Sequence, residues 1–144
     1  MIRKAVPDDL SAVKALALRL WPHHTPDALQ QELLPLLQQP DSAIFLAYQD
    51  ACVVGFAQCQ LRQDYVEGTD SSPVGYLEGI YVVPEYRRRG FAGQLISACE
   101  RWAKAAGCSE FASDCELCNE ESLRFHLRVG FQESNRIICF AKKL

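Results

Sequence analysis

The fold is decided by the stretch Gly75-Tyr76-Leu77-Glu78-Gly79-Ile80-Tyr81-Val82-Val83-Pro84-Glu85-Tyr86-Arg87-Arg88-Arg89-Gly90-Phe91-Ala92-Gly93. Residues 76–83 are apolar on both faces apart from Glu78, which is typical of an interior strand. Pro84 ends this strand. From Phe91 onward apolar residues recur at helical spacing, and Gly107 suits the position just past a helix end. The stretch therefore predicts a buried strand, a sharp turn and a helix over residues 91–106.

The turn carries the pattern Arg87-x-x-Gly90-x-Ala92. Small residues let the backbone approach a ligand, and the free N–H groups and dipole at a helix start attract an anion. The spacing fits neither a Walker loop nor Gly-x-Gly-x-x-Gly. An arginine triplet alone is typical of a solvated surface or a nucleic-acid patch, but the flanking strand and helix favour a phosphate cradle.

In this context the turn resembles the pyrophosphate-binding arm of the Gcn5-related N-acetyltransferases (GNAT), and the resemblance covers essentially the whole chain. It implies an α/β fold with a mixed sheet, the order β-α-α-β-β-β-α-β-α-β-β, and splayed, parallel fourth and fifth strands with the thioester of acetyl-CoA in the gap. The acetyl-CoA contacts that it implies fall on Ile80, Tyr81, Val82, Arg87, Arg88, Arg89, Gly90, Phe91, Ala92 and Asn119.

The remaining patterns predict elements in the same order. The expected helices cover 7–20, 25–37 and 119–129, with a kink or break at Pro35. The expected strands are 2–5, 43–48, 52–61, 110–114, 131–133 and 136–142, and residues 62–75 form a polar loop.

Composition limits the classes of function. At 144 residues the chain is expected to form one domain, residues 1–144. Its net charge of −3 argues against nucleic acid as a partner. The sequence contains neither 18 consecutive apolar residues nor a signal-peptide pattern, so we expect a soluble, cytoplasmic protein without membrane contact.

Seven cysteines give an odd number, as expected for free thiols in a reducing compartment. Four of them, Cys52, Cys59, Cys99 and Cys139, lie in apolar stretches, which predicts small core residues. The spacing Cys115-x-x-Cys118 suits a zinc knuckle or a redox pair, but no second pair or histidine lies at ligand spacing. We therefore expect no metal.

Two acids could serve chemistry. Glu78 is the one charge in an apolar strand and needs a compensating partner, and Asp114 ends the neighbouring strand, where ligand sites collect. Either acid alone is equally well explained as a solvated strand end or a structural salt bridge. Together beside the predicted cleft they favour a cationic substrate.

A narrower resemblance, to the aminoglycoside 6'-N-acetyltransferases, rests on several segments: Leu20-Trp21-Pro22, Asp64-Tyr65-Val66-x-Gly68, Ser71-Ser72-Pro73, Leu77-Glu78-Gly79-Ile80, Arg101-Trp102, Ala112-Ser113-Asp114 and Gly130-Phe131-Gln132-Glu133. It implies direct acetyl transfer from acetyl-CoA to a polycationic amine, and a homodimer to which the C-terminal strand contributes. The implied aminoglycoside contacts are Trp21, Tyr65, Glu78 and Asp114, with His24 near the pocket floor and Asn135 where relatives carry an acid.

His126 lies where many acetyltransferases place a tyrosine that protonates the departing thiolate, although a lone helical histidine is more often a packed or surface residue. Two other readings stay open. A protein of the same fold could acetylate another small amine or a protein N-terminus, or could bind acyl-CoA without catalysis.

Overall fold

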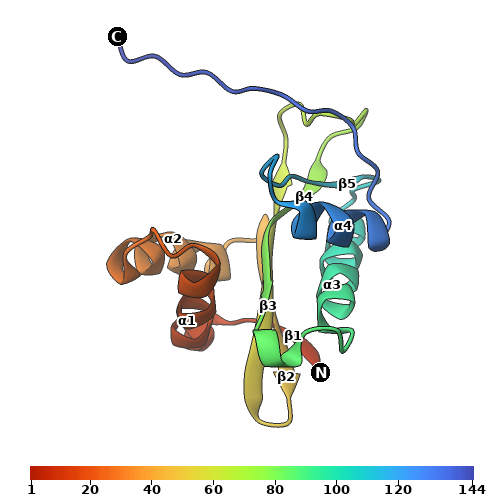
Figure 1. Ribbon diagram of the computed structural model, residues 1–144. Helices are drawn as coiled ribbons and strands as arrows, with labels where there is room; N and C mark the ends of the chain where they lie inside the picture. Colours follow the sequence, from red (N-terminus) through yellow and green to blue (C-terminus); the bar gives the residue numbers. More distant parts are fainter.

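Five strands form one mixed sheet in the order β1-β2-β3-β4-β5 (Figure 1). The computed structural model describes all 144 residues. Along the chain the elements are β1 (Ile2–Lys4), the 3-10 turn η1 (Pro7–Asp9), α1 (Leu10–Leu20), α2 (Pro26–Gln38), β2 (Ser42–Gln49), β3 (Cys52–Arg62), β4 (Val74–Val82), η2 (Pro84–Tyr86), α3 (Phe91–Ala105), β5 (Phe111–Ser113) and α4 (Glu120–Arg128). No helix combines the length and the apolar character that crossing a bilayer requires.

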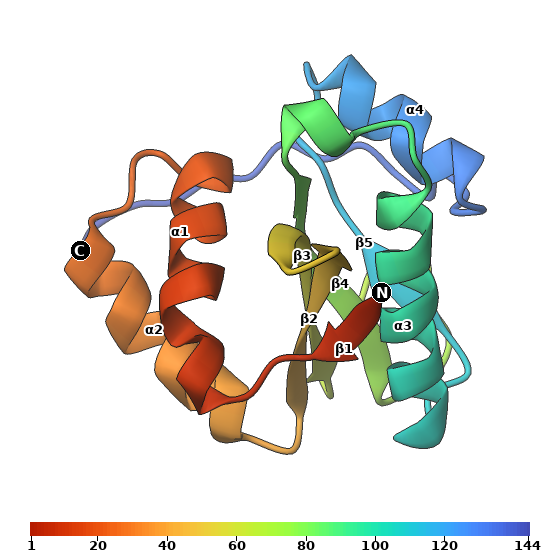
Figure 2. The same ribbon diagram turned by 90° about the horizontal axis from the view of Figure 1, so that it is seen from below.

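Two helical layers cover the sheet, with α1 and α2 on one face and α3 and α4 on the other (Figure 2). Side chains alternate between faces along each strand, so neighbouring residues of β2 and β3 enter different cores. On the α1–α2 face, Leu29 and Leu33 pack with Ile44 and Phe56. On the opposite face the core is formed by residues of α3 and the sheet, among them Ala43, Ala57, Cys59, Leu95 and Cys99.

The fourth and fifth strands part early, as the resemblance to the acetyltransferases implies. β5 runs parallel to β4 but pairs with it only through Gly75↔Phe111, Tyr76↔Ala112 and Leu77↔Ser113. At the next position Glu78 is the extra residue of a β-bulge, because the β3 register passes from Gly79 directly to Leu77. A bulge bends a strand and re-aims its groups. Beyond it, the edge of β4 faces an open fork rather than β5.

Several sequence predictions are wrong in detail. α2 continues through Pro35 to Gln38 because Leu37, beyond the proline, is buried with Leu29 and Leu33, and the Gln39 N–H donates to Pro35 O at 3.0 Å. Burial of a leucine is worth about 1.5–3 kcal/mol, which offsets much of the roughly 3 kcal/mol cost of an interior proline.

The cysteines also differ from prediction. Cys59 and Cys99 are buried, as expected, but Cys52 and Cys139 are exposed, and Cys108 is buried instead. Cys52 begins β3 directly after the hairpin turn, and Cys139 lies in the C-terminal tail. Apolar neighbours in the sequence therefore do not bury a cysteine that lies at a strand end or in a tail, where no helix or strand covers it.

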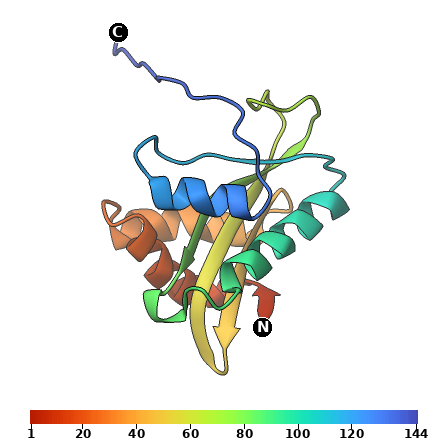
Figure 3. The same cartoon turned by 45° about the vertical axis from the view of Figure 1, so that its right-hand side comes forward.

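The C-terminal tail, residues 131–144, forms no strand, so the two closing strands expected at 131–133 and 136–142 are not formed within this chain. The tail leaves the end of α4 and extends away from the body (Figure 3). The Asn135 side-chain amide donates to Glu67 at 3.3 Å, and Ser134 lies against Gly68, so the tail is drawn to loop 63–73 rather than to β5. The order up to α4 is the one predicted.

Candidate active site

The fork between β4 and β5 presents two different faces, because successive side chains on a strand point to opposite sides. Ala112 packs with Tyr76 against Val66 and Val74. Ser113 pairs with Leu77, whose side chain lies in the α3-side core with Leu95. Ser113 therefore points to the α3–α4 face at the apex of the fork.

Glu78 has the partner that a charge in this apolar strand requires. The Arg62 guanidinium, from the end of β3, donates from Nε to Glu78 Oε1 at 3.1 Å and from Nη2 to both carboxylate oxygens at 2.9 and 3.0 Å. The Glu78 side chain is 21% exposed, and bidentate pairing of this kind holds a carboxylate in one orientation. The sequence predicts that a partner compensates the charge of Glu78 but does not identify it. The structure shows that the partner is Arg62.

Asp114 joins the same network through Tyr76. The Tyr76 hydroxyl donates to the Asp114 carboxylate, and the Arg62 guanidinium stacks over the Tyr76 ring at 3.4 Å from its centroid. Burial, followed by the nearby Asp114 carboxylate, raises the pKa of the Tyr76 phenol well above its ordinary value, so the phenol remains a donor. Glu78 and Asp114 are thus linked through Arg62 and Tyr76.

Trp21, at the end of α1, walls this network. A Cβ at Gly79 would lie 2.5 Å from the Trp21 ring, so the ring rests directly on the β4 backbone beside Glu78. Its edge meets Phe56 at a centroid distance of 6.1 Å, and the exposed His24 ring lies at 6.1 Å on the same segment. The structure therefore brings Trp21 and His24 to the face that carries Glu78.

Two predicted residues lie further out. Tyr65, in loop 63–73, is 77% exposed and contributes no hydrogen bond to the network. Asn135 bonds to Glu67 of the same loop. Tyr65 and Asn135 thus lie where loop 63–73 meets the C-terminal tail, outside the Glu78 network.

On the opposite face, His126 of α4 meets Ser113. His126 Nδ1 donates to the Ser122 carbonyl at 2.7 Å, and His126 Nε2 lies 2.7 Å from Ser113 Oγ. The Phe125 and Phe131 rings flank the imidazole at centroid distances of 5.7 and 5.2 Å. The structure thus packs His126 and also directs one ring nitrogen at the apex of the fork.

The turn before α3 has the backbone that an anion site requires. Gly90 is the N-cap of α3 with φ 85°, and Arg88 also has a positive φ of 61°. Gln94 N–H is the first in the helix to bond back, to Gly90 O at 3.1 Å, so the preceding N–H groups are free for a ligand. Phe91 is buried and Ala92 packs beside it, which anchors this first turn.

The three arginines differ in what they do. The Arg87 Nε donates to Val82 O at 2.8 Å, which ties the turn to the end of β4, and its guanidinium lies 3.9 Å from Glu121 of α4. Arg89 lies over the Tyr86 ring. Arg88 remains exposed at the strained position of the turn.

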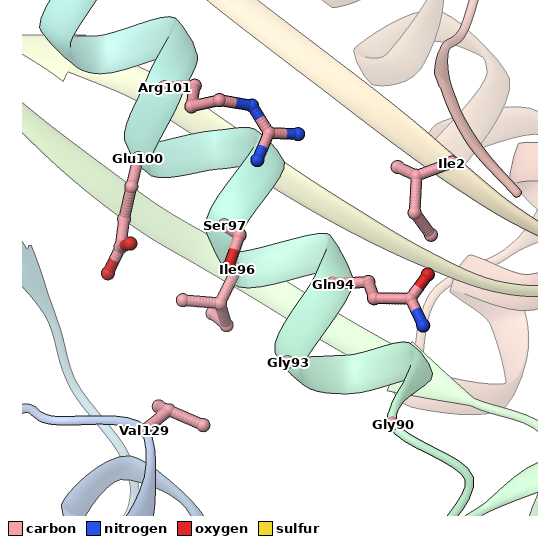
Figure 4. Close-up of a pocket in the computed structure, with 9 residues that line it drawn as sticks. All are labelled: Ile2, Gly90, Gly93, Gln94, Ile96, Ser97, Glu100, Arg101 and Val129. Atoms are coloured by element: carbon pink, nitrogen blue, oxygen red, sulfur yellow. The ribbon is translucent and has the colours of Figure 1, made fainter.

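An open groove of about 840 Å³ extends from this turn along the outward side of α3 (Figure 4). Gly90, Gly93, Gln94 and Ser97 lie along it at helical spacing, and Arg101 ends it. A Cβ at Gly93 would meet nothing within 4 Å. No residue of the Glu78 network lines the groove, so it belongs to the α3 face alone.

The loop between β5 and α4 contains three further predicted residues. Asn119 is the N-cap of α4, and its side-chain oxygen accepts from Ser122 N–H at 3.1 Å. Cys115 and Cys118 are free and exposed, and nowhere in the structure do three or more His, Cys, Asp or Glu side chains gather as metal ligands.

Comparison with known proteins assigns the sequence to a family. The model of the acetyltransferase (GNAT) family matches residues 10–131. The chain belongs to the acetyltransferase (GNAT) family. The parallel pair of β4 and β5, with the fork between them, is accordingly that of the GNAT fold.

Within the GNAT family, the chain is similar to enzymes of one kind. It is 43% identical over 138 residues to an aminoglycoside N(6')-acetyltransferase type 1 of Serratia marcescens, with 95% of this chain and 94% of that protein covered. It is 46% identical over 126 residues to one of Acinetobacter genomosp. 13, with 87% and 86% covered. It superposes on the aminoglycoside N-acetyltransferase AAC(6')-Iy in complex with CoA with a TM-score of 0.97 and 42% identity, covering 100% of this chain and 95% of that one.

Sequence reasoning missed three residues of this site: Arg62, Tyr76 and Ser113. Tyr76 was expected only as part of an apolar strand face, and Arg62 only as the start of a loop. The available signal for Ser113 was its place next to Asp114, because neighbouring strand residues face opposite sides.

Proposed function

We propose that this protein is an aminoglycoside 6'-N-acetyltransferase that transfers the acetyl group of acetyl-CoA directly to an amine. The observation that carries the proposal is the linked pair of carboxylates, Glu78 and Asp114, on the α1–α2 face of the fork. Aminoglycosides are polycations, and acids beside an aromatic wall suit an amino sugar. The aminoglycoside N(6')-acetyltransferases at 43 and 46% identity support the same substrate class.

The residues present fit acetyl-CoA. The free N–H groups from Arg88 to Ala92 would hold the pyrophosphate at the positive end of α3, and the groove along Gly93, Gln94 and Ser97 has room for the nucleotide end. The edge of β4 at Ile80, Tyr81 and Val82, with which β5 does not pair, would hold the arm and the acetyl group, with Asn119 near the arm. When bound, acetyl-CoA supplies an activated acyl group whose leaving group is a thiolate.

The side chains and backbone groups of the fork have separate roles in binding the acceptor and stabilising charge. Trp21, His24, Tyr65 and Asn135 wall the aminoglycoside, and Asp114 anchors its ammonium groups. Backbone N–H groups at the β4 bulge stabilise charge on the acyl oxygen. Arg62 and Tyr76 hold the Glu78 and Asp114 carboxylates before any ligand arrives, so these two groups need little reorganisation.

Glu78 is the proposed base. Its Oε2 accepts one hydrogen bond from Arg62, whereas a carboxylate oxygen has two lone pairs, so one site remains to take a proton from the amine, directly or through water. Such proton transfer typically contributes about 10²–10⁴-fold to rate.

A thiol-release assay with acetyl-CoA and a panel of amines tests this function. We expect rapid CoA release with kanamycin, which carries a 6'-amino group, and a product heavier by one acetyl group. An aminoglycoside with a 6'-hydroxyl in that place is the matched control and should give no 6'-acetylation. Turnover confined to peptide N-termini or simple polyamines would contradict the substrate, and acetyl-CoA binding without turnover of any amine would identify a sensor instead.

We further propose a homodimer in which the C-terminal tail pairs with the sheet of a second copy. Ile137, Ile138 and Phe140 are 68, 79 and 90% exposed, and β5 has only three residues and an unpaired outer edge. Exposed apolar strand sequence beside an open sheet edge favours strand addition.

Analytical ultracentrifugation tests the dimer. We expect twice the chain mass for the wild type and a monomer for Phe140→Asp, while Lys143→Asp, in the same tail, stays dimeric. A monomeric wild type would contradict the dimer. We place the protein, as one domain over residues 1–144, in the cytoplasm, and its seven free cysteines are consistent with a reducing compartment.

A further inference from the structure

Ser113 and His126 form a polar pair at the apex of the fork that the acceptor network does not use. Ser113 is the last residue of β5 that pairs with β4, opposite Leu77, so its hydroxyl lies where the strands separate. Its neighbour Asp114 serves the α1–α2 face through Tyr76. Ser113 is thus the hydroxyl that the fork apex presents on the face proposed for acetyl-CoA.

The hydrogen bonds of His126 fix which nitrogen faces Ser113. A backbone carbonyl only accepts, so the 2.7 Å contact with Ser122 O means that His126 Nδ1 carries a proton. His126 Nε2 therefore interacts with Ser113 Oγ, also at 2.7 Å. With a neutral ring, the Ser113 hydroxyl donates to Nε2. With a charged ring, Nε2–H donates to Ser113 Oγ, and the hydroxyl proton is released to another acceptor; the Asp114 carbonyl oxygen lies 3.5 Å from Ser113 Oγ.

Packing leaves the imidazole little freedom to exchange these roles. Phe125 and Phe131 flank the ring at 5.7 and 5.2 Å, and Phe131 also packs on Phe111 of β5 at 6.0 Å. The contact between Ser113 and His126 joins β5 to α4, and packing fixes which ring nitrogen faces Ser113. A group oriented in this way can pass a proton in one direction, from ring to hydroxyl to fork.

We propose that Ser113 is the catalytic residue that protonates the departing thiolate, with His126 as its proton source; this inference rests on the proposed function. The amine nitrogen forms a bond to the acyl carbon and loses one proton to Glu78, the carbon–sulfur bond breaks, and its electron pair remains on sulfur. The Ser113 hydroxyl proton passes to that sulfur, and His126 Nε2–H replaces it on Ser113 Oγ. His126 ends neutral, with Nδ1–H still on Ser122 O, and regains its proton from solvent.

Steady-state kinetics with two acyl donors test the relay. Ser113→Ala should lower kcat with acetyl-CoA by about 100-fold, the low end of the range for general acid catalysis, because a thiol with a pKa of about 8.5 departs with modest help. An activated aryl thioester, whose thiolate is stable without a proton, should lose less than about threefold. Ser113→Thr, which keeps the hydroxyl, should restore most of the rate, and Ser109→Ala, in the exposed connection before β5, should match the wild type.

Nitrogen NMR of the ligand-free protein supplies a readout that does not depend on turnover. The chain has only three histidines, so the His126 signals are readily assigned. We expect Nδ1 to carry a proton in both the neutral and the charged ring, and the Nε2 signal to shift in Ser113→Ala but not in Ser109→Ala.

The outcomes separate the two claims. A wild type that acetylates no amine would contradict the proposed function. An active wild type with equally active Ser113→Ala, or equal losses with both acyl donors, would contradict the relay alone. A neutral His126 with its proton on Nε2 would also contradict it.

Discussion

The face of the fork that carries Glu78 and Asp114 differs from the face that carries Ser113 in what holds its groups. On the first face, four side chains from two strands, β3 and β4, and from the residue after β5 constrain one another: Glu78, Arg62, Tyr76 and Asp114. On the second, the donors are mostly backbone groups at the start of α3, and His126 is fixed by a carbonyl of its own helix. Side-chain substitution on the first face can therefore change the substrate range while the second face keeps its contacts to acetyl-CoA.

The largest expected effect is on the α3 face. Gly90→Glu places a side chain at φ 85°, which costs about 1–2 kcal/mol, and adds a negative charge where a phosphate is expected to bind. The affinity for acetyl-CoA, measured by calorimetry, should fall by roughly 100-fold or more. Gly107→Glu is the matched control, with φ 93° at the other end of α3 and open space around it. If both variants bind acetyl-CoA like the wild type, the turn is not the phosphate site.

A smaller effect is expected on the opposite wall. Gly79→Ala would bring a Cβ to 2.5 Å from the Trp21 ring and 2.9 Å from Leu20, so the ring must move. Overpacking of this kind costs about 1–3 kcal/mol. Urea unfolding should show this loss, with an altered tryptophan fluorescence in the folded state.

Gly93→Ala, which fills open space in α3, is the control for that variant and should be neutral or slightly stabilising. Unchanged stability and fluorescence in Gly79→Ala would mean that Trp21 does not rest on the β4 backbone.

The smallest effect is expected outside the fork. The Arg3 guanidinium, which donates to Asp9 at 2.7 and 2.8 Å, lowers the pKa of the Asp9 carboxyl below its ordinary value. A lowered folded pKa adds stability above the unfolded pKa of about 3.9, and that stability is lost as the pH falls through the folded pKa. Asp9→Asn should therefore be less stable than the wild type at pH 7, and the gap should close towards pH 3.

Urea midpoints at the two pH values measure this gap, and acetyl-CoA affinity at pH 7 should be unchanged. A gap that widens on acidification would contradict the Arg3–Asp9 pairing.

The sequence could predict features that depend on neighbouring residues, but not contacts between residues that are far apart in the chain. The strand, turn and helix of residues 75–106 were predictable because Pro84, Gly90 and Gly107 act on their own neighbourhoods. The Arg62–Glu78 pair was not, because it depends on the register of β3 against β4 and on the bulge that re-aims Glu78. The tail has strand-like sequence, but a strand needs an edge to pair with, and within one chain residues 134–135 are held by loop 63–73.

Steady-state kinetics of Glu78→Gln and Asp114→Asn with kanamycin test the central claim, that the carboxylates of the α1–α2 face form the acceptor site. Glu78→Gln should lower kcat by about 10²-fold or more, and Asp114→Asn should chiefly raise KM for kanamycin, while both keep wild-type affinity for acetyl-CoA. Asp50→Asn, in the distant β2–β3 turn, is the matched control and should behave as the wild type. Near-wild-type turnover and KM in both fork variants would contradict the account.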